Sequence, residues 1–133
     1  MNPSLVLFFC IFIACSMSYN TSKITSASVW SRPKQSGPDV VGHWGVVVTV
    51  QGHGNYLLHN TPYTGTVATV ASNMSSQWKK RSDIPVAGTK TIRGAMQASH
   101  GAATNYVSSA LARYVMGDTC VGTAAKIAHY LLD

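Results

Sequence analysis

The spacing of apolar residues places the regular elements of this chain in its middle and C-terminal parts. Two apolar runs, HWGVVVTV (43–50) and NYLLHN (55–60), are joined by QGHG. β-Branched and apolar runs on either side of a short glycine-containing turn are typical of a β-hairpin. A further run, GTVATVAS (65–72), predicts a third strand.

The C-terminal part of the chain changes to helical spacing. NYVSSALARYVM (105–116) carries apolar residues at intervals of three and four, and GD ends this pattern. TCVGTAAKIAHYLL (119–132) predicts a second helix, with Asp118 or Thr119 as its N-cap and Cys120 in its first turn. TKTIRGAMQ (89–97) is compatible with either strand or helix. Strands followed by helices predict an α+β fold, in which a small antiparallel sheet packs against helices.

The remaining segments divide the chain into three parts. Residues 1–18 hold a short apolar run that ends in small residues, which predicts a secretory signal peptide and therefore an exported protein. An uncleaved N-terminal anchor is the alternative. Residues 19–41 are polar and rich in Ser, Thr, Pro and Gly, and they predict a polar N-terminal segment outside the folded domain. Residues 42–133 form that domain.

Charge narrows the range of partners. The 133-residue chain contains ten Lys and Arg and four acidic residues, so its net charge is +6. A basic balance favours anionic surfaces such as lipid headgroups or acidic cell-wall polymers. The basic residues are scattered apart from one cluster, Lys79–Arg81, which predicts a solvated loop. The sequence around this cluster contains no nucleic-acid-binding motif. We therefore expect no nucleic-acid partner.

Cys120 is the residue that gives the chain a candidate chemistry. Cys10 and Cys15 would leave with the signal peptide, so the exported chain keeps one thiol and cannot form an internal disulfide. A cysteine in the first turn of a helix meets free backbone amides and the positive end of the helix dipole, and both stabilise a thiolate. His43 and His59 lie near corresponding ends of the predicted hairpin, where one can act as a base and the other can orient it.

These residues resemble a known enzyme superfamily. HWGVVV and YLLHN, followed far downstream by a cysteine at a helix start, resemble the circularly permuted papain-like enzymes. This superfamily includes the NlpC-type cell-wall hydrolases and the lecithin:retinol acyltransferase-like proteins. The resemblance implies a permuted papain-like fold with Cys120 as nucleophile, His43 as general base and His59 as the group that orients it. We expect neither a cofactor nor a metal at this site. Thr119 stands where the acyltransferases usually have Asn before the cysteine, which weakens the match to that branch.

The resulting expectation is a secreted thiol hydrolase or acyltransferase that acts through an acyl-cysteine. Its substrate would be an anionic polymer or lipid, with a peptidoglycan amide slightly favoured over a phospholipid ester. We also expect a monomer, and contact with a membrane surface is compatible with the charge. The alternatives are a non-catalytic secreted binding or effector protein of the same fold, and a zinc site, for which His43, His59 and Cys120 are legitimate ligands.

Overall fold

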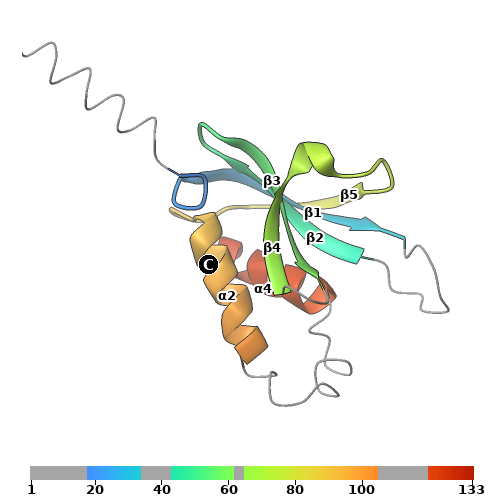
Figure 1. Cartoon of the computed structure of the whole chain (residues 1–133). Helices are drawn as coiled ribbons and strands as arrows, with labels where there is room; N and C mark the ends of the chain where they lie inside the picture. The colour runs from blue at the N-terminus through green and yellow to red at the C-terminus, as the bar shows by residue number, and fades with distance from the viewer. Residues whose placement is uncertain (1–17, 34–42, 62–64, 105–119) are drawn as a thin grey trace, which may run out of the picture.

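A five-stranded antiparallel sheet with helices on one face forms the body of the protein (Figure 1). The computed structural model describes residues 18–33, 43–61, 65–104 and 120–133, without the side chains of residues 100–104, 120 and 121. The strand order is β4-β3-β2-β1-β5. The predicted α+β class is therefore confirmed.

The predicted hairpin and third strand are present. Strands β2 (His43–Val50) and β3 (Gly54–Thr61) pair directly, and β4 (Gly65–Val70) adds to the free side of β3. The β2–β3 turn contains Gly52 at φ +78° and Gly54 at φ +91°. Glycine adopts such positive φ angles at little steric cost, which explains the QGHG sequence between the two apolar runs.

Two strands of the sheet lie where the sequence predicts none. β1 (Ile24–Arg32) comes from the predicted polar N-terminal segment, and it lies between β2 and β5 (Lys79–Ile84). The prediction of a solvated loop at Lys79–Arg81 is wrong, because these residues begin the edge strand β5. The register of β1 shifts near Ile24 against β2 and near Val29 against β5. Such irregularities interrupt the alternation by which strands are recognised in a sequence.

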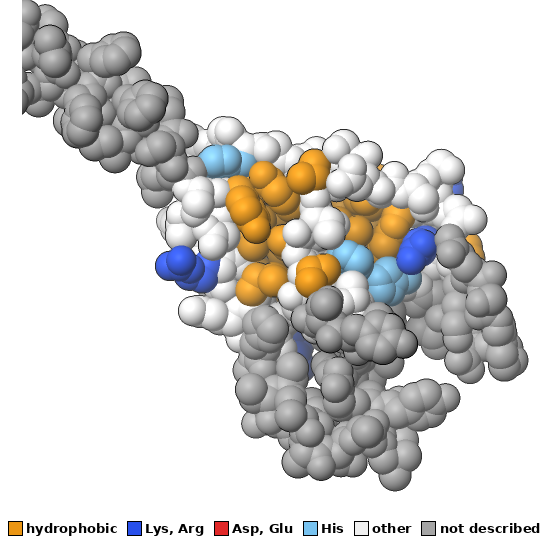
Figure 2. Space-filling model, in the orientation of Figure 1, with side chains coloured by type: hydrophobic (Ala, Val, Ile, Leu, Met, Phe, Trp, Pro, Cys, Tyr) orange, Lys and Arg blue, Asp and Glu red, His pale blue; other side chains and the backbone are white. Residues whose placement is uncertain are grey.

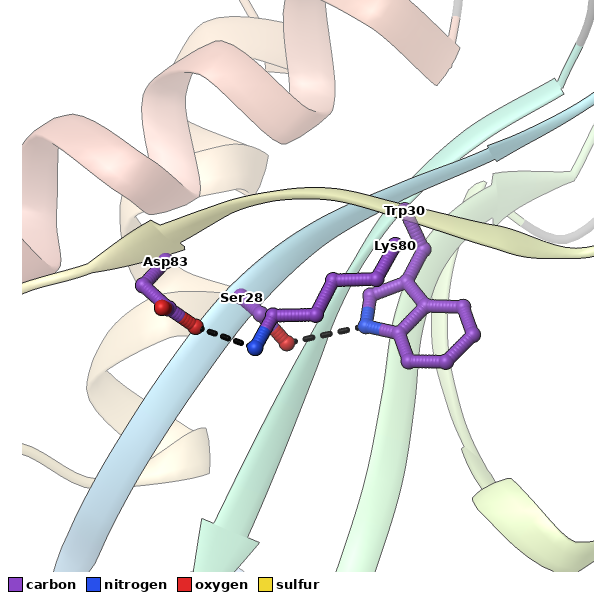
Figure 3. A network of polar contacts seen from close by, with 4 residues as sticks. All are labelled: Ser28, Trp30, Lys80 and Asp83. Atoms are coloured by element: carbon purple, nitrogen blue, oxygen red, sulfur yellow. Dashed lines mark hydrogen bonds and ion pairs between the residues drawn. The ribbon is translucent and has the colours of Figure 1, made fainter.

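The sequences of β1 and β5 look like loops because both strands carry polar side chains, which contact each other within each strand. The Trp30 indole Nε1 donates to Ser28 Oγ at 2.8 Å, and Lys80 Nζ pairs with Asp83 at 2.5 Å (Figure 3). Trp30 lies opposite Lys80 in the register, and Ser28 lies opposite Asp83. β5 is exposed along almost its whole length, so its residues carry little hydrophobic signal.

Two helices belong to the described residues. α2 (Ile92–Thr104) begins just after Thr91, whose Oγ1 accepts a hydrogen bond from the Gly94 amide at 3.1 Å and so caps the helix. This decides the ambiguous segment 89–97 in favour of a helix. α4 (Cys120–Leu132) confirms the predicted C-terminal helix, whereas the helix predicted over 105–116 lies outside the described residues. A short 3₁₀ turn, η1 (Ala71–Asn73), follows β4. Within the described ranges, no helix has the length and apolar character needed to cross a bilayer.

The hydrophobic core lies between the sheet and the two helices. Its largest fully buried side chains come from β1, β2, β3, α2 and α4: Ile24, Val46, Val48, Val50, Leu58, Ile92, Ile127 and Leu131. Trp44 and Tyr56 also pack against this core. Successive side chains of a strand point to opposite faces, so the residues between these core positions on β2 and β3 face away from the helices.

α4 runs in the same direction as β2 along the sheet. The Ala87 amide donates to the Leu131 carbonyl at 2.9 Å, and the Ile24 amide donates to the Lys90 carbonyl at 2.8 Å. Ile24 in turn pairs with Val50 at the end of β2, so the C-terminal end of α4 lies near that end of the sheet. At about 1.5 Å per residue the helix is about 20 Å long, against about 26 Å for β2 at about 3.3 Å per residue. α4 therefore begins towards the end of the sheet where β2 begins, as Figure 1 also shows.

Candidate functional site

His43 and His59 form a direct ring-to-ring hydrogen bond. His43 Nε2 and His59 Nδ1 are 2.8 Å apart, and the ring planes meet at 82°. Gly45 lies opposite His59 in the β2–β3 register, so His43 is the diagonal neighbour of His59 on the same face. The prediction that the two histidines lie close across the hairpin is confirmed.

Trp78 and Arg32 complete a cluster around this pair. The Trp78 ring centroid is 5.4 Å from that of His43 and 6.2 Å from that of His59, and only 7% of the Trp78 surface is exposed. Arg32 Cζ lies 5.4 Å from the centroid of the Trp78 ring. Arg32 is also the β1 partner of His43. We call these four residues the His43 cluster.

Sequence reasoning missed Arg32 and Trp78. Arg32 joins the cluster only because β1 pairs with β2, and β1 was not predicted. Trp78 immediately precedes β5, on a segment that links the two edge strands of the sheet. A tryptophan in an otherwise polar stretch is the one signal that pointed to a buried contact there.

The environment of the pair favours neutral imidazoles. Burial, followed by the charges of His59 and Arg32, lowers the pKa of His43 from its ordinary 6.5 to about 4. Burial and Arg32 also lower the pKa of His59. Neutral rings can share one N–H between them, with one nitrogen donating and the other accepting. Near neutral pH, the pair therefore holds an unprotonated imidazole that can accept a proton.

The His43 cluster lies on the face of the sheet that points away from the helices. Trp44 and Leu58 pack into the core, so His43 and His59 next to them point to the other face. His43 and His59 are each partly buried. In the view of Figure 2, histidine side chains reach the surface beside basic and apolar side chains. On the helix-facing side of the same end of the sheet, Asn60 is buried.

Cys120 is the first residue of α4, as predicted, and its side chain lies outside the described part of the structure. The beginnings of α4 and β2 lie towards the same end of the molecule, in the helix layer and the sheet respectively. The structure thus brings His43 and His59 together, and it describes no contact between them and Cys120. Among the described residues, no group of three His, Cys, Asp or Glu side chains is arranged to hold a metal ion.

Comparison with known proteins finds one viral relative. The chain is 31% identical over 90 residues to uncharacterized protein R800 of Acanthamoeba polyphaga mimivirus, and the match covers 67% of this chain and 74% of that protein. The chain belongs to the same family as this mimivirus protein. No family model matches the chain, and no solved structure matches it.

Proposed function

We propose that this protein is a thiol-dependent hydrolase or acyltransferase with a permuted papain-like arrangement of Cys120, His43 and His59. The observation that carries the proposal is the 2.8 Å hydrogen bond between the two histidine rings. A general base needs a fixed ring orientation and a free nitrogen, and a second side chain on its other nitrogen supplies the orientation. Of the two nitrogens of His43, Nε2 is occupied by His59, and Nδ1 has no hydrogen-bond partner among the described residues.

The chemistry follows from these two nitrogens. With Nε2–H donated to His59, His43 Nδ1 accepts the proton of the Cys120 thiol, and the thiolate attacks the carbonyl carbon of an amide or ester. The resulting imidazolium then returns the proton to the leaving amine or alcohol as its bond to the carbonyl carbon breaks. Water, or another acceptor, attacks the acyl-cysteine while His43 takes its proton, and the thiol is regenerated.

The fold sets a condition on how Cys120 reaches His43. The histidines face away from the helix layer to which Cys120 belongs, so contact through the sheet is not feasible. His43 and Cys120 are the first residues of their elements, and these elements begin towards the same end of the molecule. We therefore propose that the thiol and the imidazole meet around that end of the sheet.

Alkylation of the thiol tests this proposal. Iodoacetamide labelling across pH 5–9, mapped to Cys120 by mass spectrometry, should show labelling well below the range of a free thiol, whose pKa is about 8.5. His43→Ala should slow this labelling, because the thiol then lacks its proton acceptor. His129→Ala is the matched control, because His129 is exposed in the last turn of α4 and pairs with Asp133 at 3.3 Å. Labelling that follows an ordinary thiol in all three proteins would exclude an activated nucleophile.

A second candidate is a binding protein without turnover. The orientation of the His43 cluster away from the helices favours it, because a binding surface needs no nucleophile from that layer. An unactivated Cys120 together with a specific ligand at the cluster would support it.

We propose an exported protein that acts on an anionic polymer or lipid, with a cell-wall peptide amide slightly favoured over a phospholipid ester. Turnover of peptidoglycan fragments and of phospholipid vesicles by the wild type, compared with Cys120→Ala, distinguishes the two substrates.

A further inference from the structure

Arg32 places a cation inside the His43 cluster. Its guanidinium lies over Trp78, and its strand position is paired with His43. Arg32 Nε is buried and has no hydrogen-bond partner among the described residues. A buried donor without an acceptor is unfavourable, and an arginine donor is more so because it carries charge.

The described acidic residues do not neutralise this charge. Asp83 pairs with Lys80 on the edge strand, and Asp133 pairs with His129 at the end of α4. The histidines beside Arg32 cannot serve as counter-ions, because a histidine is either neutral or positive. Within the described residues, the cluster therefore has an excess of positive charge next to a proton acceptor.

We propose that Arg32 binds an anionic oxygen group of the substrate, a carboxylate or a phosphodiester, next to the group on which His43 acts. This inference rests on the proposed function for the identity of the ligand as a substrate. A guanidinium presents several N–H donors in a fixed planar fork that matches two oxygens of such an anion. Trp78 holds the fork in position through a cation–π contact.

A bound anion would also raise the pKa of His43, the proposed base. Arg32 is one of the charges that keep the imidazoles neutral, and the other charged or titratable group acting on His43 is His59. An anion at Arg32 compensates its charge, so it raises the pKa of both histidines. The pKa of His43 then moves towards the range in which a general base is most effective. Arg32 would bind a substrate that carries such an anion, and the bound anion would make His43 a stronger proton acceptor.

Binding of small anions to the full chain tests the inference. At constant ionic strength, acetate and dimethyl phosphate are titrated separately while the Arg32 Nε–H and the histidine ring signals are followed by NMR. We expect saturable shifts of both sets of signals in the wild type. Arg32→Gln should weaken binding, read from the histidine signals, at least tenfold. Arg93→Gln removes an exposed arginine from α2 and should bind as the wild type does.

Comparing acetate with dimethyl phosphate distinguishes the two kinds of substrate anion. Tighter binding of acetate supports a peptide carboxylate, and tighter binding of dimethyl phosphate supports a lipid phosphodiester. Non-saturable shifts, or shifts that are equal in Arg32→Gln, would overturn the inference. The two proposals can fail separately. Rapid alkylation of Cys120 without anion binding would overturn only the Arg32 site. Anion binding together with an ordinary thiol would leave Arg32 as the ligand site of a binding protein.

Discussion

His43 is the residue whose protonation the fold opposes most clearly. Half-burial on the sheet, the neighbouring imidazole of His59 and the charge of Arg32 all disfavour its charged form. Its ordinary pKa applies in the unfolded chain, where none of these contacts exists. The folded protein therefore binds fewer protons at this position than the unfolded chain does at mildly acidic pH.

This difference predicts that stability depends on pH. Since the folded pKa of His43 is depressed from 6.5 to about 4, its contribution is fully present above pH 6.5 and is lost as the pH falls from there towards 4. Urea unfolding at pH 7.5, 5.5 and 4.5 should give a falling free energy of unfolding. His43→Gln removes one titrating group and should make this profile less steep, while His59, whose pKa the fold also lowers, continues to contribute. His129→Ala should keep the full slope. An equally steep fall in His43→Gln would exclude His43 as a source.

At the residue scale, the sequence allows the pair to be predicted but not its surroundings. His43 and His59 stand in one hairpin, so their proximity follows from local pairing alone. Arg32 and Trp78 join them through β1 and the segment before β5, which are contacts between distant parts of the chain. Local patterns do not specify which distant strand will lie beside β2.

Close packing at Gly45 controls the geometry of the histidine pair at the scale of the hairpin. A Cβ atom at this position would lie 2.7 Å from Leu57 Cδ1, 3.0 Å from the Leu58 carbonyl oxygen and 3.2 Å from His59 Cβ. The carbonyl belongs to the sheet backbone and cannot move without disturbing the pairing of β2 with β3.

Gly45→Ala should therefore separate the two strands locally. We expect a loss of about 1–3 kcal/mol, the usual cost of adding a methyl group to a well-packed site. The NMR signals of the His59 ring should shift, because the backbone of His59 is displaced. The signals of the exposed His129 should not shift. A fully stable Gly45→Ala protein with unchanged His59 signals would contradict tight packing around Gly45.

A second close approach joins the two helices. A Cβ at Gly94 of α2 would lie 1.8 Å from the hydroxyl oxygen of Tyr130 and 2.5 Å from its Cζ, so the Tyr130 ring of α4 fills the space beside the glycine. Lys90 Nζ lies 4.8 Å from the centroid of the same ring. Glycine is a poor helix former, and its presence within α2 is explained by this contact.

A double-mutant cycle separates packing from helix propensity at this contact. Gly94→Ala alone should destabilise the protein by about 1–3 kcal/mol through overlap with Tyr130. In a Tyr130→Ala background the overlap is gone, and the same change should become neutral or stabilise by up to about 1 kcal/mol. Thermal unfolding of the four proteins measures the coupling. A coupling near zero would mean that Tyr130 does not occupy this space.

At the scale of the molecule, the sheet depends on a strand from the least regular part of the sequence. The α+β class and the hairpin could be predicted because their apolar runs are continuous, and α4 because its buried positions repeat at helical intervals. β1 mixes Ser and Thr with its apolar residues and has an irregular register, so its sequence resembles a polar segment. Its role becomes apparent only from its place in the sheet between β2 and β5.

This topology predicts that the folded unit begins before residue 42. A chain starting at residue 42 lacks β1, and β5, whose partner in the described sheet is β1, loses its attachment. Burial of a side chain the size of Ile24 contributes about 1.5–3 kcal/mol, and each lost hydrogen bond between strands about 0.5–1.5 kcal/mol. Over the length of β1, the sum is comparable to the 5–15 kcal/mol by which domains are typically stable.

We therefore expect the chain 42–133 to be unfolded and the chain 19–133 to fold. Circular dichroism and the dispersion of amide NMR signals should show a cooperative transition for the longer chain and none for the shorter one. Ile24→Ala in the longer chain tests the same dependence without a truncation. It should lower the free energy of unfolding by about 2–5 kcal/mol, because a fully buried side chain is removed from the core. Cooperative unfolding of the chain 42–133 would show that β2, β3 and β4 form a stable unit with the helices, and that β1 and β5 are additions to it.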